Sequence, residues 1–362
     1  MLHLSPTQLT GALAFVLAGM MVYVLTPFMA GFAHRIGVVD SPGDERRIHL
    51  DATPLLGGLV MYLAVLVTIV LLVPFDATVK TIVLGGTVIA IVGLVDDLVQ
   101  IRPLVKFIGQ LAAIAVALGF DVRMTRFSLP FVRGSAQLPL TVSVVVTLLW
   151  FAAIVNMVNF IDGLDGLAAG VCSISALTFG VIAFSLGRVD TGIVAVTLAG
   201  AALSFLRFNF HPASIFMGDT GSMFLGYVLG VLSVQGVMKS TATVALILPL
   251  LVLGVPFIDL FLIVFRRFRK RVPFYAAAQD HVHHDLVLVA GFSQRKSVLL
   301  LWGWCLLLNG TAVAMAEKSR EATIALGAAS VLATVFIARL LQRYRQAAAA
   351  AEATAGRPAE GK

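Results

Sequence analysis

The sequence predicts an all-α, polytopic membrane protein with ten or eleven transmembrane helices. Of its 362 residues, 59% are hydrophobic and only 12% are charged, and the mean hydropathy is +0.98. Soluble domains carry about 25% charged residues, and a protein core cannot absorb this excess of apolar side chains. The lipid bilayer is therefore expected to be the solvent of much of the chain.

Runs of about 20 apolar residues mark the helices that can cross a bilayer. The first run lacks a preceding basic segment and a small-residue cleavage site, so we expect it to be retained and not removed as a signal peptide. A polar kink alone divides the fifth run from the sixth, which leaves ten spans as the alternative to eleven. The expected spans are 8–32, 53–74, 79–95, 104–120, 138–157, 166–186, 191–207, 218–236, 241–265, 296–316 and 321–341.

Most of the 26 lysines and arginines lie in the loops that follow odd-numbered spans. The positive-inside rule therefore predicts that these loops and the C-terminus are cytoplasmic and that the N-terminus is outside. The net charge of +7 is explained by these loops, and no nucleic-acid partner is expected. We expect one transmembrane domain, 1–345, and a disordered cytoplasmic tail, 346–362. The loops expected to carry the chemistry are 34–52, 96–103, 158–166, 207–219 and 266–295.

The first of these loops contains Arg46, Arg47 and His49, which could bind phosphate. Gly57 and Gly58 follow at the start of a span, where glycine allows close backbone approach. The alternative is a basic anchor at the membrane surface, followed by glycines that serve helix packing.

The third span ends in the adjacent acids Asp96 and Asp97, with Lys106 shortly after them. Two neighbouring carboxylates repel each other, so a divalent cation, a lysine or a bound proton must compensate their charge. A solvated helix end is the alternative, although carboxylates at a helix C-terminus oppose the helix dipole.

Four oxygen-bearing side chains recur every third residue between the fifth and sixth spans. Glycines follow the two acids and suggest that the helix breaks there, which would gather the row around one site. Hard oxygen ligands of this kind suit Mg²⁺ or Mn²⁺. Capping of the next helix is a competing explanation for one of the acids. The row is Asn156, Asn159, Asp162 and Asp165.

Two more polar groups occupy later loops of the same set. Asp219 opens the eighth span, after a loop that contains Asn209, and it is interpreted either as a metal ligand or as a helix cap. The three histidines of the long basic loop could bind a metal or an anion. Their spacing on a helix would not surround one ion, so phosphate or sugar binding is favoured over a metal site or a fortuitous cluster. They are His281, His283 and His284.

All of these groups belong to the loops of one predicted membrane face. Aspartates, a divalent cation and basic side chains together describe a phosphoryl-transfer site. The surrounding spans could offer an apolar groove to a second, lipid-borne substrate. The sequence lacks a Walker A motif, which excludes a P-loop enzyme.

Taken together, the motifs between Asp40 and Arg295 resemble those of the polyprenyl-phosphate N-acetylhexosamine-1-phosphate transferase family. The resemblance implies a Mg²⁺-dependent membrane enzyme in which a lipid phosphate attacks the β-phosphorus of a UDP-sugar and UMP leaves. Two positions depart from the family pattern. His211 stands where asparagine is more usual, and Leu55 stands where many members have arginine.

The resemblance also implies roles for individual residues. Asp96, Asp97 and Asp162 would be catalytic, with Asp96 deprotonating or positioning the lipid phosphate. Asp219 and Asn159 would hold Mg²⁺, with Mn²⁺ as an alternative ion. The substrate-binding residues would be Arg46, Arg47, His49, Lys106, Asn156, Asp165, Asn209, His281, His283 and His284, with Lys106 on phosphate and Asp165 near the uridine.

The motif His-Val-His-His resembles the branch that transfers GlcNAc-1-phosphate. The expected partners are therefore UDP-N-acetylhexosamine, undecaprenyl or another polyprenyl phosphate, and the bilayer of a bacterial cytoplasmic membrane, with the site on the cytoplasmic face. The product would start a cell-envelope polysaccharide, and a homodimer is open by family analogy alone. Phospho-MurNAc-pentapeptide transfer is the near alternative. A secondary transporter is the distant one, because transporters place polar groups near the midplane of paired halves.

Overall fold

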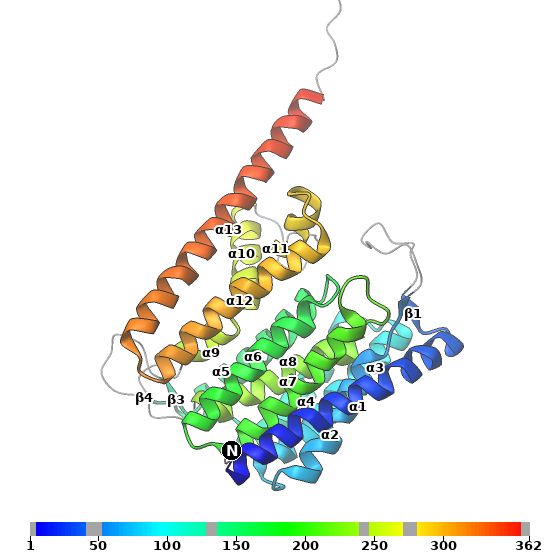
Figure 1. Cartoon of the computed structure of the whole chain (residues 1–362), viewed down its shortest axis with the longest axis vertical. Helices are drawn as coiled ribbons and strands as arrows, with labels where there is room; N and C mark the ends of the chain where they lie inside the picture. Colours follow the sequence, from blue (N-terminus) through cyan, green and yellow to red (C-terminus); the bar gives the residue numbers. More distant parts are fainter. Residues whose placement is uncertain (1–4, 41–52, 128–135, 239–245, 271–280, 356–362) are drawn as a thin grey trace, which may run out of the picture.

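The computed structural model describes residues 5–40, 53–127, 136–238, 246–270 and 281–355 of the chain. The predicted phosphate-binding residues Arg46, Arg47 and His49 lie outside the described residues. Most of the helices run side by side in one oblique bundle (Figure 1). They are α1 (Pro6–Ile36), α2 (Gly57–Leu72), α3 (Ala77–Val99), α4 (Pro103–Gly119), α5 (Leu140–Ile161), α6 (Leu167–Ser185), α7 (Val189–Asn209), α8 (Gly218–Leu232), α9 (Ile247–Val252), α10 (Gly254–Lys270), α11 (Val282–His284), α12 (Gln294–Ala316) and α13 (Arg320–Ala355).

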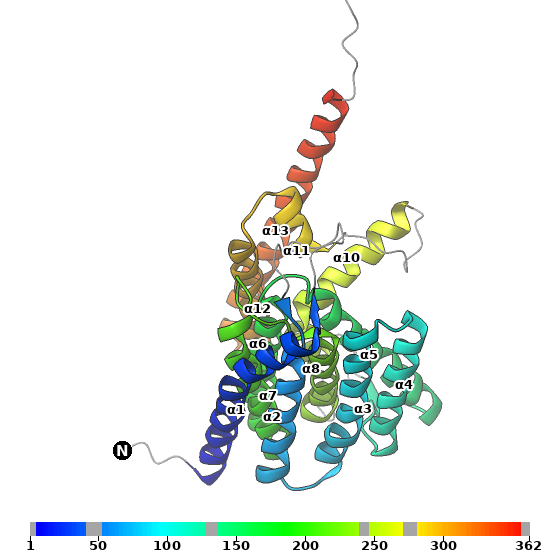
Figure 2. The same ribbon diagram turned by 90° about the vertical axis from the view of Figure 1, so that its right-hand side faces the viewer.

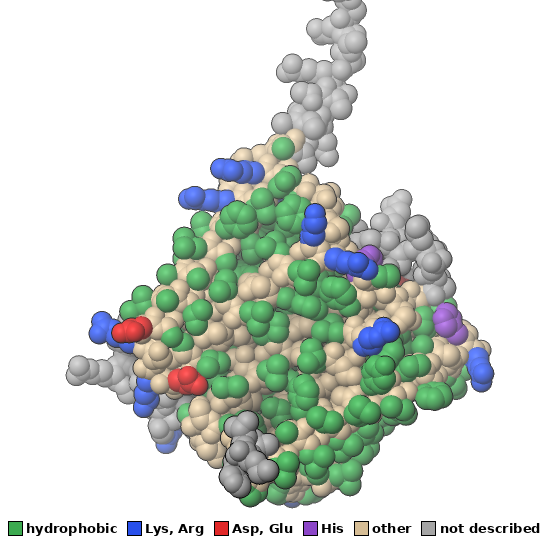
Figure 3. All heavy atoms as spheres, viewed as in Figure 1, with side chains coloured by type: hydrophobic (Ala, Val, Ile, Leu, Met, Phe, Trp, Pro, Cys, Tyr) green, Lys and Arg blue, Asp and Glu red, His purple; other side chains and the backbone are tan. Residues whose placement is uncertain are grey.

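Among the described residues, seven helices are long and apolar enough to cross a membrane. The helices α2 and α4 are equally apolar in character but shorter. Large hydrophobic side chains also cover the outside of the bundle, such as Phe28 on α1 and Leu332 on α13, which are 73% and 69% exposed. Figure 3 shows hydrophobic side chains spread over one face, which only lipid can cover favourably. The prediction of a polytopic α-helical membrane protein is confirmed.

The ninth expected span is not one continuous helix in the described residues. It is divided into α9 and α10 at Leu253, which has left the helical conformation. Gly254 and Pro256 follow. Glycine is a poor helix former, and Pro256 has no N–H to donate to the carbonyl of Val252, four residues earlier. Figure 2 shows that α10 consequently leaves the bundle at an angle.

Two short antiparallel strand pairs interrupt the all-α pattern. Strand β1 (Val39–Asp40) pairs with β2 (Thr53–Pro54), with Val39 opposite Pro54. Strand β3 (Arg126–Phe127) pairs with β4 (Ala136–Gln137), with Arg126 opposite Gln137. The two pairs lie at opposite ends of the helical bundle (Figure 1). Each strand has only two residues, too few for an alternating hydrophobic pattern to be recognised in the sequence.

The C-terminal helix is longer than the sequence suggested. Disorder was expected from residue 346, but α13 continues to Ala355. A run of alanines follows Gln346, and alanine has the highest intrinsic helix propensity. The expectation of disorder is therefore wrong for 346–355, and residues 356–362 lie outside the described part of the chain.

Helix α8 lies in the centre of the bundle, and its residues from Thr220 to Leu232 are buried. Helix α2 closely approaches the start of α8 at the two glycines where the sequence predicted close backbone contact. The N–H groups of Gly57 and Gly58 donate to the carbonyls of Phe216 and Met217 at 3.0 and 2.9 Å. Helix α3 approaches equally closely at Gly93, where a Cβ atom would lie 2.5 Å from the Thr220 backbone. These contacts fix the ends of α2, α3 and α8 together.

Candidate functional site

A cavity of about 990 Å³ opens at the end of the bundle where α3, α5 and α7 end and α8 begins. The strand β1 and the short helix α11 lie at the same end (Figure 1). Predicted polar side chains from four separate loops therefore meet at one place. The predicted site residues that line the cavity are Asp96, Asp97, Asn159, Asp162, Asp165, Asn209, Asp219 and His284.

The adjacent acids Asp96 and Asp97 have different partners. Both carboxylate oxygens of Asp97 bind the first turn of α8: they accept from the N–H groups of Asp219 and Thr220 at 2.7 and 3.0 Å, and from the Thr220 hydroxyl at 2.6 Å. Asp97 thus caps α8 across more than 120 residues of sequence and places Asp219. This is the capping function that a local sequence pattern normally supplies at a helix N-terminus.

Lys106 connects Asp96 with Asp219. Its ammonium donates to Asp96 at 3.1 Å and forms an ion pair with Asp219. The second oxygen of Asp96 accepts from the Ile101 N–H at 2.8 Å, which closes the turn between α3 and α4. The lysine predicted to compensate the acid pair therefore compensates one acid of that pair together with Asp219.

Asn159 and Asp219 form the next contact of the site. The Asn159 amide donates to Asp219 at 2.6 Å and to the Ser222 hydroxyl at 2.9 Å. Gly218 precedes Asp219 with a φ of 65°, and a Cβ atom there would lie 2.5 Å from the Asp97 carboxylate. Only glycine combines this left-handed conformation with the space that Asp97 leaves. The orientation of Asp219 therefore depends on Asn159, Lys106 and the backbone at Gly218.

Asp162 ends α5 and faces the cavity. Within the described residues no hydrogen-bond donor contacts its carboxylate. Burial, and then the charges of Asp219 and Asp97, raise the pKa of the Asp162 carboxyl to about 8. A carboxylate without a donor, close to other carboxylates, is a group that a cation would stabilise.

Asp165 and Asn209 hold the loops that border the cavity. The buried Asp165 carboxylate contacts the ring of His211 at 2.8 Å and accepts from the Ala213 N–H at 3.0 Å. Asn209 accepts from the Gly166 N–H and donates to the Ile215 carbonyl, both at 3.0 Å. His211, which stands where asparagine is more usual, therefore has a defined partner. Both predicted substrate-binding residues also have a structural task.

Asn156 is the member of the predicted row that does not line the cavity. Its amide exchanges hydrogen bonds with Gln110 on α4, at 2.8 and 3.3 Å. A pair of amides in an apolar bundle satisfies both polar groups and fixes the two helices against each other. This geometry favours a packing role for Asn156 over the predicted contact with substrate.

The residues from His281 to His284, here called the histidine segment, pack against the turn between α5 and α6. His284 lines the cavity, whereas the buried His283 lies against Gly163, where a Cβ atom would be 2.5 Å from its Nε2. Burial, and then the neighbouring His284, lowers the pKa of His283 to about 3, so its ring is neutral at pH 7. The pKa of His284 is also lowered, mainly by burial. Neutral rings can accept as well as donate hydrogen bonds.

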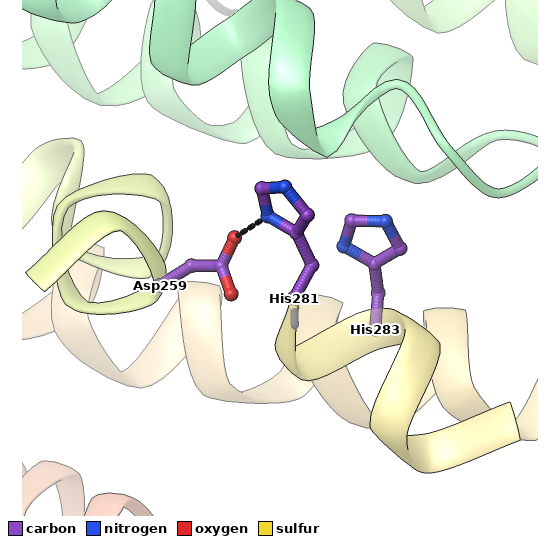
Figure 4. Close-up of side chains that lie close together, drawn as sticks. All are labelled: Asp259, His281 and His283. Carbon is purple, nitrogen blue, oxygen red and sulfur yellow. Dashed lines mark hydrogen bonds and ion pairs between the residues drawn. The ribbon is translucent and has the colours of Figure 1, made fainter. Parts of the chain in front are cut away.

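Asp259 of α10 anchors the same segment. Its carboxylate contacts the His281 ring at 2.8 Å and accepts from the Val282 N–H at 2.7 Å. Figure 4 shows the Asp259 carboxylate facing the ring of His281, with the ring of His283 beside it. Ligand atoms of all three lie within 4.8 Å, close enough to hold a metal ion. Both Asp259 oxygens already have N–H partners, so Asp259 acts here as a hydrogen-bonded anchor of the segment.

Three residues of the site region were missed by the sequence reasoning. Asp259 lies inside an expected span, and an ionisable group at that depth is itself a functional signal that should have been used. Gln110 gives the same signal more weakly, as a polar residue in an apolar span. Ser222 gives no signal in the sequence, because serine is common in membrane helices and its partner Asn159 is distant in the chain.

The donor atoms around the cavity fit a hard divalent cation. Carboxylates of Asp162 and Asp219, with the amide of Asn159, offer the oxygen ligands that Mg²⁺ prefers in proteins. The Lys106 ammonium offsets part of the negative charge of Asp96 and Asp219. The carboxylate of Asp97 accepts hydrogen bonds from three donors of α8, so it is less able than Asp162 and Asp219 to bind a cation.

Similarity to known proteins identifies the family of this chain. The model of glycosyl transferase family 4 matches residues 79–237, a range that includes the acid pair, the Asn159–Asp165 turn and Asp219. A protein of Bacillus subtilis (strain 168), named probable undecaprenyl-phosphate N-acetylglucosaminyl 1-phosphate transferase, is 37% identical over 295 residues, which are 80% of each chain.

Two further relatives cover as much of the chain. The decaprenyl-phosphate N-acetylglucosaminephosphotransferase of Mycolicibacterium smegmatis is 34% identical over 354 residues, which are 90% of this chain and 87% of the relative. The phospho-N-acetylmuramoyl-pentapeptide-transferase of Moorella thermoacetica is 33% identical over 313 residues, which are 81% and 94% of the two chains. The chain therefore belongs to glycosyl transferase family 4, as a member of the polyprenyl-phosphate N-acetylhexosamine-1-phosphate transferases that its motifs resemble.

Proposed function

We propose that this protein transfers GlcNAc-1-phosphate from UDP-GlcNAc to undecaprenyl or another polyprenyl phosphate and releases UMP. The observation that carries the proposal is the cavity of about 990 Å³ at the end of an apolar bundle, which is lined by Asp96, Asp162 and Asp219. Lys106 pairs with two of these acids, Asp96 and Asp219. Acidic groups that can hold a cation, next to lipid-facing helices, suit one diphosphate substrate and one lipid substrate. Relatives named for GlcNAc phosphate transfer to undecaprenyl and decaprenyl phosphate support both substrates.

The cofactor that fits this site is Mg²⁺, with Mn²⁺ as an alternative. When bound, the cation would neutralise charge on the donor diphosphate. Asp219 and Asp162 would hold it, and Asn159 would contribute its amide oxygen or keep Asp219 oriented through the present hydrogen bond. Lys106 would exchange its contact with Asp219 for a contact with substrate phosphate, while it remains paired with Asp96.

Asp96 would position or deprotonate the lipid phosphate, because its carboxylate lies at the cavity wall next to the exposed apolar end of α3. Leu98 and Val99 of that end are 49% and 67% exposed and could contact the lipid chain. Asp97 would act on the reaction through α8, by fixing the start of the helix that carries Asp219. His284, which also lines the cavity, would contact the sugar or phosphate of the donor.

We further propose that the protein crosses the cytoplasmic membrane eleven times, with the N-terminus outside and the cavity on the cytoplasmic side. Two observations support this topology. Each expected span contains helical residues. In the described part of the chain, the basic residues Arg102 and Arg207 are two positions from the cavity-lining residues Gln100 and Asn209. The product would then form where cytoplasmic sugar nucleotides are available and would start a cell-envelope polysaccharide. A homodimer is proposed by analogy with the family only.

Transfer of phospho-MurNAc-pentapeptide is the second candidate function. The relative from Moorella thermoacetica that is 33% identical supports it. Its support is weaker than that for GlcNAc-1-phosphate, since the protein of Bacillus subtilis is 37% identical. The two donors differ by a large peptide, so direct competition in one assay separates them.

The proposal is tested with membranes, radiolabelled UDP-GlcNAc, undecaprenyl phosphate and Mg²⁺. We expect label in the lipid phase together with UMP, and loss of both on addition of EDTA. The variant Asp219→Ala should remain inserted and folded but lose transfer, whereas Arg343→Ala, which changes an exposed side chain of α13, should retain it. Transfer from UDP-MurNAc-pentapeptide alone would select the second candidate, and near-normal turnover of Asp219→Ala would refute the metal assignment.

A further inference from the structure

The carboxylate of Asp285 is buried between two arginines from different helices. Arg345 of α13 approaches it with its Nη2 at 2.6 Å from each oxygen and its Nε at 3.2 Å from Oδ1. Arg266 of α10 donates to Oδ2 at 3.1 Å. Asp285 is only 3% exposed, so its charge depends on these guanidinium groups for compensation.

The position of Asp285 in the chain connects this cluster to the cavity. Asp285 directly follows His284, which lines the cavity, and begins the π-helical turn η2 (Asp285–Val289). The preceding helix α11 has three residues. Such short helical pieces have little stability of their own, because helix formation needs several turns to offset its nucleation cost. The placement of the histidines must therefore come from contacts with other elements.

Two anchors bracket the histidine segment. At its start, Asp259 of α10 accepts from the Val282 N–H at 2.7 Å and contacts the His281 ring. At its end, Arg345 and Arg266 hold Asp285. The ring of Phe292, shortly after η2, also lies against Tyr344 of α13, with the ring centroids 6.4 Å apart. Helix α13 thus contacts this part of the chain at two places, through Arg345 on Asp285 and through Tyr344 on Phe292.

We propose that Arg345 is a positioning residue of the transfer reaction, which acts through Asp285 to hold His284 at the cavity wall. This inference rests on the proposed function and extends it to the C-terminal helix. Figure 1 shows α13 running along α12 and reaching the α11 end of the bundle. None of the described residues that line the cavity belongs to α13. The helix therefore serves the site without contributing a side chain to it.

The geometry favours positioning over simple docking of α13. Docking of α13 on α12 is already provided by the hydrogen bonds from Trp304 to Thr334 at 3.0 Å and between Thr311 and Ser330 at 3.1 Å. Arg345 lies beyond both contacts, at the level of the histidine segment. A bidentate guanidinium–carboxylate pair fixes orientation as well as distance, which a single contact of a lysine ammonium would not do equally well.

The first experiment compares Arg345→Ala with the matched control Arg343→Ala, in the full-length protein. Arg343 lies two residues away on the same helix and is exposed. With the donor varied, Arg345→Ala should raise KM for UDP-GlcNAc about tenfold, because it removes charge-assisted hydrogen bonds from a buried carboxylate. The KM for polyprenyl phosphate should stay within about twofold, as should both constants of the control. Arg345→Lys should restore part of the loss.

The second experiment asks whether Arg345 acts through Asp285. In a double-mutant cycle, Arg345→Ala should cost much less in the Asp285→Asn background than in the wild type. Equal costs in both backgrounds, or equal losses in Arg343→Ala and Arg345→Ala, would overturn the proposal. So would a loss in Arg345→Ala that appears only as a lower melting temperature with both KM values unchanged.

Amide hydrogen exchange provides a readout that does not need turnover. Residues 282–292 should exchange faster in Arg345→Ala than in Arg343→Ala, while α8 keeps its protection. Absence of transfer in the wild type would refute the proposed function and leave this comparison intact. Unchanged exchange in 282–292 would refute the positioning role, whatever the activity of the wild type.

Discussion

Asp96 and Asp97 are neighbours in the chain, but their surroundings assign them different tasks. Three donors of α8 surround the Asp97 carboxylate, whereas Asp96 accepts from Lys106 and the α3–α4 turn. Asp96 is therefore the acid of the pair that we propose acts on substrate, and Asp97 stabilises the helix that presents Asp219. The two adjacent acids, which look like one catalytic motif in the sequence, therefore differ in their structural roles.

Substitution of the two acids should separate these tasks. Asp97→Asn replaces a charged acceptor of three donors, so we expect a loss of about 1 to 2 kcal/mol in the free energy of unfolding, in addition to a large loss of rate. Asp96→Asn should lose a comparable rate with the melting temperature nearly unchanged. Thermal unfolding in detergent and turnover assays of both variants measure this, and equal melting shifts in the two would contradict the assignment.

The raised pKa of the Asp162 carboxyl predicts that cation binding depends on pH. Its pKa is raised to about 8, so the carboxyl is largely protonated at pH 7 when no cation is bound. A divalent cation binds the deprotonated form, so its binding should release a proton below pH 8 and should tighten as the pH rises from 6.5 to 8.5. Calorimetric titration with Mg²⁺ in buffers of different ionisation enthalpy measures the released proton. Asp162→Asn should abolish this pH dependence, and an unchanged dependence in that variant would show that another group is responsible.

At the scale of elements, the turn between α5 and α6 connects the acids to the histidine segment. Gly163 lies at this turn between Asp162 and Asp165, and His283 packs directly on it. The glycine that was expected to break the helix therefore has a second use, because it leaves room for an imidazole ring. The contact couples α11 to the same loop that carries the acids.

A methyl group at this position should disturb the site without unfolding the protein. In Gly163→Ala the new Cβ atom would lie 2.5 Å from His283 Nε2, so the ring and α11 must move. We expect kcat/KM for the sugar nucleotide to fall about tenfold or more, since misplacement by an ångström can cost a hundredfold. Gly119→Ala is the matched control, because no atom lies within 4 Å of its Cβ position. Steady-state kinetics would contradict the packing argument if both variants behaved alike.

At the scale of the whole molecule, the site exists because the ends of several helices meet around the buried helix α8. The glycines Gly58 and Gly93 let α2 and α3 approach its first turn closely. Long apolar helices with exposed hydrophobic surfaces hold this arrangement in lipid. The membrane therefore sets both the direction of the helices and the common level at which their polar ends lie.

The proposed topology can be tested with cysteine variants, since Cys172 and Cys305 are both buried. Lys318 lies in the turn between α12 and α13, and Gln346 lies near the opposite end of α13; both are exposed. A membrane-impermeant maleimide should label Lys318→Cys in intact cells and Gln346→Cys in inside-out vesicles only. The opposite pattern would place the cavity outside the cell and would exclude a cytoplasmic sugar nucleotide as donor.

Much of the architecture followed from composition and periodicity. Each expected span contains helical residues, because 20 apolar residues in lipid must satisfy their backbone groups internally. The ninth span was predicted as one helix, although Gly254 and Pro256 offered a local signal for the break. The extension of α13 to Ala355 was missed because low complexity was interpreted as disorder, while helix propensity favoured the alanines.

The sequence by itself determined the class of protein, the approximate positions of its helices and the set of loops that hold the polar groups, because hydropathy and charge are local properties of the chain. Only the tertiary structure decided what each group does. Asp97 caps a helix more than 120 residues away, Asn156 pairs with Gln110, and Arg345 reaches Asp285 from the C-terminal helix. The role of a buried polar side chain depends on its partner, and here the partners are brought together by packing between distant segments.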